Sequence, residues 1–186
     1  MTNPTALLII DMLNAFDFDG AEPLIEATRA IVDPINRLRR VARAAGSPFI
    51  YVNDNYNRWT DERSELIAWL TRDEARGRDI ARAILPADDD YFVIKPESSG
   101  FYSTTLPALL PRLGVTSLVL TGVAADICVL FTAADAHMRE YKLHVPADTV
   151  AGLDADRKQW ALTIMQDSMS ADTRPSAECS FERAPE

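Results

Sequence analysis

Cys128 lies where a strand-like run gives way to a helix, which is a position suited to a nucleophile. The apolar run breaks at Gly122, and helical apolar spacing begins a few residues later, so the thiol falls in the first helical turn. Backbone N–H groups and the helix dipole at that end favour a thiolate and can form an anion site. The position predicts a nucleophilic cysteine, and a buried structural cysteine is the alternative that position alone leaves open.

Two further reactive side chains end predicted strands. Asp11 closes one apolar run and Lys95 closes another. In an open α/β sheet, ligands bind beyond the carboxyl ends of the strands. A carboxylate that takes the thiol proton, and an ammonium that favours charged neighbours, would support acyl transfer at Cys128. Taken singly, Asp11 could be a turn residue and Lys95 a solvated charge, but three such residues at one sheet edge favour catalysis.

Strands and helices alternate along the whole chain. Apolar runs predict strands at 6–10, 49–52, 91–94, 117–121 and 143–147, with a weak final strand from Asp172 onward. Helical spacing predicts helices at 22–45, 62–70, 78–85, 105–113, 126–141 and 155–167, and Pro34 should kink or divide the first. The alternation predicts an α/β fold with a parallel sheet covered on both faces. We expect one domain over residues 1–172 and a C-terminal tail over 173–186.

Composition narrows the class of protein. The chain has 186 residues, 47% of them apolar, and a net charge of −9. That charge argues against nucleic acid and anionic membrane surfaces as partners. Two distant cysteines give no disulfide framework, and no apolar run approaches the roughly 20 residues of a membrane span. We therefore expect a soluble, cytoplasmic protein that acts on a small molecule.

Three segments, in order along the chain, resemble one known family. They are LLIIDMLNAF (7–16), VIKPESSGFYSTTL (93–106) and TGVAADICVLFTAADAHMREYKLHVPADTVAG (121–152). This set is similar to the isochorismatase-like cysteine hydrolase superfamily, which includes nicotinamidases and N-carbamoylsarcosine amidohydrolases. The resemblance covers about residues 6 to 170. It implies a three-layer α/β/α sandwich with a six-stranded parallel sheet, Rossmann-like, and a homo-oligomer, either a dimer or a tetramer.

The resemblance also implies roles for particular residues. The family's catalytic triad falls on Asp11 as general base and then acid, Lys95 as the group that positions the carboxylate, and Cys128 as the nucleophile. A non-proline cis peptide would lie between Val123 and Ala124. The N–H groups of Ala124 and Cys128 would form the oxyanion hole.

The chain departs from its relatives at two places. Leu13 and Ala15 replace a Gln and an Asp that relatives often carry, whereas Asn14 and Phe16 remain and would line the mouth of the substrate pocket. The nicotinamidase branch has a metal site made of one Asp and two downstream His. Here the next histidine after Asp54 is His137. We therefore expect no metal and no other cofactor.

Substrate specificity should come from loops at the same sheet edge. The loop after the second strand could supply an apolar wall and a polar group that orients the substrate, although a simple polar turn is an equal alternative. Aromatic residues after Gly100 could form another wall, although the first of them could be core. The residues expected at the substrate are Asn14, Phe16, Asp54, Tyr56, Trp59, Phe101, Tyr102 and Val123.

The residues together predict a cysteine hydrolase. It would cleave a C–N bond of a small amide, imide or carbamoyl metabolite through a covalent thioester-type intermediate on Cys128. One alternative is ether hydrolysis of the isochorismatase type, but family members specialised for that reaction lack this cysteine. Another is a non-catalytic ligand-binding or scaffold protein of the same family. The specific substrate is left open by the sequence.

Overall fold

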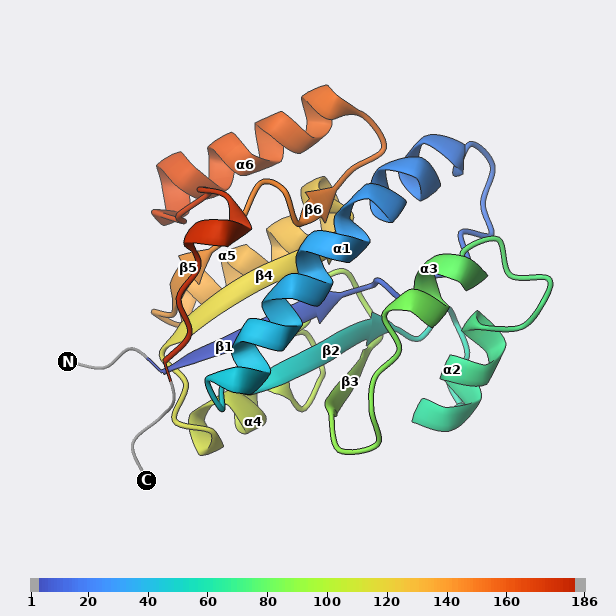
Figure 1. Ribbon diagram of the computed structural model, residues 1–186, viewed down its shortest axis with the longest axis horizontal. Coiled ribbons are helices and arrows are strands. Elements are labelled where there is room, and N and C mark those ends of the chain that lie inside the picture. Colours follow the sequence, from blue (N-terminus) through green and yellow to red (C-terminus); the bar gives the residue numbers. More distant parts are fainter. Residues whose placement is uncertain (1–3, 183–186) are drawn as a thin grey trace.

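Six parallel strands form one sheet in the computed structural model, which describes residues 4–182 (Figure 1). The strands are β1 (Thr5–Ile10), β2 (Phe49–Asp54), β3 (Tyr91–Lys95), β4 (Ser117–Val123), β5 (Lys142–His144) and β6 (Val150–Ala151). Their order is β3-β2-β1-β4-β5. β5 pairs with the first half of β4, and β6 pairs with the last two residues of β4. The predicted α/β fold with a six-stranded parallel sheet is confirmed.

The strand order reverses at the centre of the sheet. The chain passes from β1 through β2 to β3 on one side and then returns to place β4 on the other side of β1. Every residue of β1 is buried, because helices cover both faces of the sheet. The carboxyl ends of β1 and β4 therefore lie at the switch point, which is where ligands bind in open α/β sheets.

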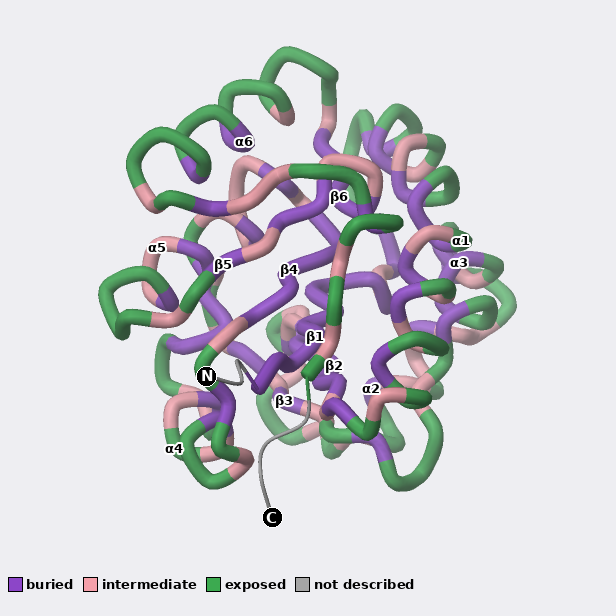
Figure 2. The backbone as a smooth tube through the Cα atoms, turned by 60° about the vertical axis from the view of Figure 1, so that its left-hand side comes forward, coloured by how far each residue is buried: buried purple, intermediate pink, exposed green. Residues whose placement is uncertain are grey.

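Two helical layers enclose the sheet, and the burial is concentrated between them (Figure 2). One apolar core lies under α1 (Glu22–Ala44), α2 (Arg63–Leu70) and α3 (Arg78–Ala83). The other lies under α4 (Leu106–Arg112), α5 (Leu130–Met138) and α6 (Ala155–Met169). No helix within residues 4–182 combines the length and apolar character that a membrane span needs.

The first helix is not divided at its internal proline. α1 runs from Glu22 to Ala44 as one helix with Pro34 inside it, so the expected division is wrong. Its buried stripe, which includes Leu24, Ile31 and Ile35, continues on both sides of the proline. Packing of that stripe against the sheet outweighs the loss of one backbone hydrogen bond.

The sixth strand is not the one expected from the sequence. β6 covers two residues, Val150–Ala151, and pairs with Gly122 and Val123 of β4. The segment from Asp172 onward makes only isolated bridges, of Asp172 with His144 and of Glu182 with Pro4. A two-residue strand is too short to show a pattern in sequence. Residues 183–186 of the expected tail lie outside the described residues.

A glycine at the end of β4 permits close contact between the central strands. Gly122 has a φ of +111°, and an added Cβ would lie 2.0 Å from the carbonyl oxygen of Ile10. We expect Gly122→Ala to lower the free energy of unfolding by about 3 kcal/mol or more, because backbone must move to relieve the clash. Urea denaturation followed by circular dichroism measures the change.

Gly20 provides the matched control for this substitution. Its φ is also positive, at +77°, but no atom lies within 4 Å of an added Cβ. Gly20→Ala should therefore cost only the backbone strain, about 1–2 kcal/mol. Equal losses in the two variants would show that the contact with Ile10 does not matter for stability.

Candidate active site

Asp11 turns out of β1 into the space between the central strands. Its φ of +49° is left-handed, and its N–H donates to the carbonyl of Val52 at 3.0 Å. One carboxylate oxygen, Oδ1, accepts the backbone N–H of Asp54 at 2.7 Å. The side chain is therefore held from the neighbouring strand, with its second oxygen directed to another partner.

That partner is Lys95, the last residue of β3, whose side chain is fully buried. Its Nζ lies 2.9 Å from Oδ2 of Asp11 and 3.1 Å from Oδ2 of Asp54. It also donates to the Glu97 carbonyl at 3.1 Å and lies 3.5 Å from Sγ of Cys128. One ammonium thus links the ends of three strands and the candidate nucleophile.

Cys128 lies in a π-helical turn, Ala125–Val129, between β4 and α5. Sequence periodicity predicted an ordinary α-helix from residue 126, and the wider turn corrects that prediction. The carbonyl of Ala124 accepts the N–H groups of both Ile127 and Val129 at 3.1 Å. The expected cis peptide between Val123 and Ala124 is present.

The surroundings of the Cys128 thiol shift its pKa. Burial, and after it the Asp11 carboxylate, raises the pKa of the Cys128 thiol above its usual range, by more than Lys95 lowers it. Burial therefore opposes the thiolate that the helix end and the lysine favour. The raised pKa favours the protonated thiol, and the Asp11 carboxylate is the negative group that contributes most to that shift.

Asp11 and Lys95 have complementary environments. Burial raises the pKa of Asp11 even though Lys95 opposes the shift, which brings the carboxyl closer to a proton-accepting role near neutrality. Burial alone would lower the pKa of Lys95, but Asp11, Cys128 and Asp54 raise it above its usual value. The ammonium therefore stays charged.

The loop after β2 brings Asp54 and Tyr56 to this group. Oδ1 of Asp54 accepts the N–H of Tyr56 at 2.7 Å, and the Tyr56 hydroxyl donates to the carbonyl of Leu13 at 3.0 Å. Burial raises the pKa of the Tyr56 phenol, and the carboxylates of Asp11 and Asp54 add to the shift. Both residues, expected at the substrate, therefore lie beside the triad.

Three more residues expected at the substrate, two in the turn after β1 and one at the end of β4, are largely buried. Asn14 is half-buried, and its side chain accepts the N–H of Phe16 at 2.8 Å within the turn after β1. Phe16 is fully buried and packs in the core against Gly77. Val123 is also buried in that core. These side chains shape the layer under the site from the α1 side.

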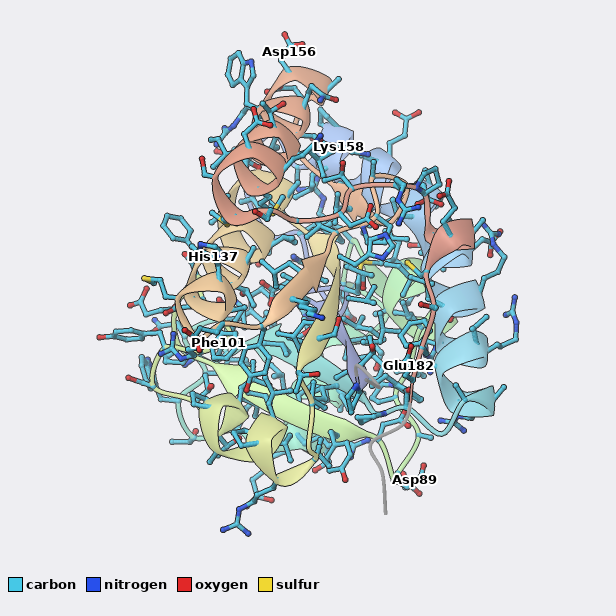
Figure 3. All side chains as sticks on the ribbon, turned by 90° about the vertical axis from the view of Figure 1, so that its left-hand side faces the viewer. Asp89, Phe101, His137, Asp156, Lys158 and Glu182 are labelled. Carbon is cyan, nitrogen blue, oxygen red and sulfur yellow. The ribbon has the colours of Figure 1, made fainter. Side chains whose placement is uncertain are left out.

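Phe101 is not part of the site. Its ring lies 6.2 Å from the Tyr141 ring and 4.9 Å from the Arg139 guanidinium, beyond the carboxyl end of α5. Cys128 precedes the other end of that helix. Figure 3 shows Phe101 on the same side of the molecule as His137. The expectation that Phe101 forms an aromatic wall of the substrate pocket is therefore wrong, because its ring is buried in the apolar core.

Two other aromatic residues face solvent. Trp59 is 71% exposed, and its indole N–H donates to Asn57 at 2.8 Å. Tyr102 is 58% exposed, and its N–H donates to the carbonyl of Ser99. At these exposures neither ring is packed into the site.

The pairing of Asp54 with Lys95 was missed in the sequence. The two residues are register partners at the ends of β2 and β3, so adjacent strands place them side by side. Each residue ends a strand, and that position could have marked both as candidate site residues. The register that places them side by side depends on how the two strands pair. Across residues 4–182, no group of three or more His, Cys, Asp or Glu residues is arranged to hold a metal ion.

Comparisons with known proteins agree with this fold. Residues 5–176 match the Isochorismatase domain family. The chain is 43% identical over 167 residues to an uncharacterized isochorismatase family protein, YaaI, of Bacillus subtilis, covering 90% of this chain and 91% of the relative. It is 31% identical over 165 residues to the ureidoacrylate amidohydrolase RutB of Klebsiella pneumoniae, covering 74% and 69% of the two chains.

Among solved structures, the N-carbamoylsarcosine amidase of Thermoplasma acidophilum is 29% identical, with a TM-score of 0.70. The match covers 95% of this chain and 99% of that one. The family match spans nearly all of the described chain, including the three strand ends that hold the site. The chain therefore belongs to the isochorismatase family and is a hydrolase with amidohydrolase relatives.

Proposed function

We propose that this hydrolase cleaves a C–N bond of a small amide, imide or carbamoyl compound through a thioester on Cys128. The observation that carries the proposal is the contact of an acid, an ammonium and a thiol within one buried cluster. In such a cluster the Asp11 carboxylate can accept the thiol proton as Cys128 attacks.

The first half of the reaction forms the thioester. Sγ of Cys128 attacks the carbonyl carbon while its proton passes to Asp11, and the carbonyl electron pair moves to oxygen. The N–H groups of Ala124 and Cys128 would stabilise this oxyanion. When the C–N bond breaks, Asp11 returns the proton to the leaving nitrogen.

The second half releases the acid. Asp11 takes a proton from water as the water oxygen attacks the thioester carbonyl. The C–S bond then breaks, and the proton returns to sulfur. Lys95 keeps its charge throughout and holds the Asp11 carboxylate in place through the 2.9 Å contact. The products are a carboxylic or carbamic acid and ammonia or an amine, or an amide when the substrate is an imide.

A panel of small amides, imides, carbamoyl compounds and isochorismate tests the proposal. We expect ammonia or amine release from at least one C–N substrate, with no activity after Cys128→Ala. Pyruvate release from isochorismate that survives Cys128→Ala would instead support ether hydrolysis. Binding of panel compounds without turnover of any would support the non-catalytic alternative.

A further inference from the structure

The Lys95 ammonium is fully occupied within the protein. An ammonium has three N–H donors. Four acceptors surround this one, namely carboxylate oxygens of Asp11 and Asp54, the Glu97 carbonyl and the Cys128 sulfur, at 2.9–3.5 Å. The Lys95 side chain is also fully buried. The Asp11 and Asp54 carboxylates therefore neutralise its positive charge, and the ammonium has no N–H left to bind a substrate.

The charge that the cluster presents to solvent is negative. The Asp54 side chain is 31% exposed, compared with 5% for Asp11 and 0% for Lys95. Two carboxylates and one ammonium leave a net charge of minus one. Moving the thiol proton from Cys128 to Asp11 does not change this total. The Asp54 carboxylate is thus the most exposed charge of the cluster both before and after that transfer.

Two arginines on the flanking elements are also committed. Arg58, on the loop after β2, pairs with Asp61 and lies 5.0 Å from the centre of the Trp69 ring. Arg157, in the first turn of α6, lies 2.5 Å from the carboxylate of Asp126 in the π-helical turn. Neither arginine is free to bind a carboxylate of a substrate.

We propose that this site accepts uncharged amides and rejects those that carry a carboxylate, and that Asp54 enforces the selection. The inference rests on the C–N hydrolase function proposed above. A carboxylate on the substrate would lie near Asp54 in a partly buried setting, where like charges repel more strongly than in water. An uncharged amide instead presents N–H groups, which the partly exposed Asp54 carboxylate can accept through its remaining lone pairs.

Two alkylating reagents test the selection without knowledge of the substrate. Iodoacetamide is uncharged and iodoacetate carries a carboxylate, and both alkylate the same thiol. Their rates at Cys128 are measured by peptide mass spectrometry and divided by their rates with N-acetylcysteine amide. We expect the normalised preference of Cys128 for iodoacetamide to be at least about tenfold, because the anion is repelled.

Variants assign the preference to Asp54. Asp54→Asn should reduce the preference severalfold, whereas Asp19→Asn, which removes the same charge from an exposed position after β1, should not. Should Asp54→Asn fail to fold, the wild-type preference measured in about 0.05 M and 1 M salt serves instead, since screening should weaken it. A normalised preference near one, or one that is equal in wild type and folded Asp54→Asn, overturns the proposal.

Matched substrates separate this inference from the function on which it rests. Succinamide is compared with succinamate, and N-carbamoylglycinamide with N-carbamoylglycine, by ammonia release. Faster hydrolysis of the carboxylate-bearing member of each pair overturns the charge selection but leaves the hydrolase function intact. An alkylation preference that holds while no C–N substrate is cleaved overturns the function and retains the selection as a binding property.

Discussion

Replacing Cys128 with serine is expected to lower kcat/KM for amide hydrolysis by at least roughly 1,000-fold. Serine keeps the size of the side chain, but its hydroxyl is a much weaker acid than a thiol. Asp11, though its pKa is raised by burial, would then be too weak a base to deprotonate it. Ammonia release from the best amide of the panel measures the loss. The near-ultraviolet circular dichroism spectrum should be unchanged.

Cys179 supplies the control in the same chain. Its sulfur lies 3.3 Å from Nδ1 of His144, and burial, with Asp148 and Asp172, raises its pKa to about 12. It belongs to the C-terminal segment rather than to the strand ends of the site. Cys179→Ser should therefore retain activity within about twofold. Full activity of Cys128→Ser, or a comparable loss in Cys179→Ser, would contradict covalent catalysis at Cys128.

Asp11→Asn is expected to have two opposite effects. Hydrolysis should fall roughly 100- to 10,000-fold, because the proton acceptor is lost. The Cys128 thiol should nevertheless ionise more easily, because the Asp11 carboxylate raises its pKa in the wild type while Lys95 lowers it. Loss of the carboxylate removes the raising influence and leaves the ammonium. The variant should thus be a poorer enzyme with a more reactive thiol.

The pH dependence of alkylation measures the second effect. Iodoacetamide should modify Cys128 of Asp11→Asn at least about tenfold faster than the wild-type residue at pH 8, since the thiolate fraction rises tenfold for each unit by which the pKa falls. The inflection of the rate should move to lower pH. Asp19→Asn, which carries the same substitution on the surface, should match the wild type. A slower or unchanged rate in Asp11→Asn would show that Asp11 does not control the thiol.

The sequence by itself determined the strand layout and the three strand-end residues. A strand such as β1, which is buried on both faces, must be apolar throughout, and its first polar residue marks its end. Asp11 and Lys95 end or follow apolar runs in this way. Cys128 follows the break at Gly122, where the backbone leaves β4. Parallel strands bring their carboxyl ends to one edge, so local pattern was sufficient to predict that these groups meet.

Other features depended on contacts between distant segments. The two residues of β6 are recognised as a strand only by their pairing with β4. The partnership of Asp54 with Lys95 depends on the register of β2 and β3, which no single strand contains. Phe101 follows a polar loop like a binding-site residue, yet its ring packs beside Tyr141. In each case the structure is decided by a contact with a segment far away in the sequence.

The pKa shifts of the site depend on the tertiary structure. A helix end and a lysine favour a thiolate at Cys128, and both could be inferred from local sequence. Burial acts in the opposite direction, as does the negative charge of Asp11, and both arise only when the layers close over the strand ends. The residue types and their order therefore determine which groups can react, whereas desolvation and register determine which of them holds the proton.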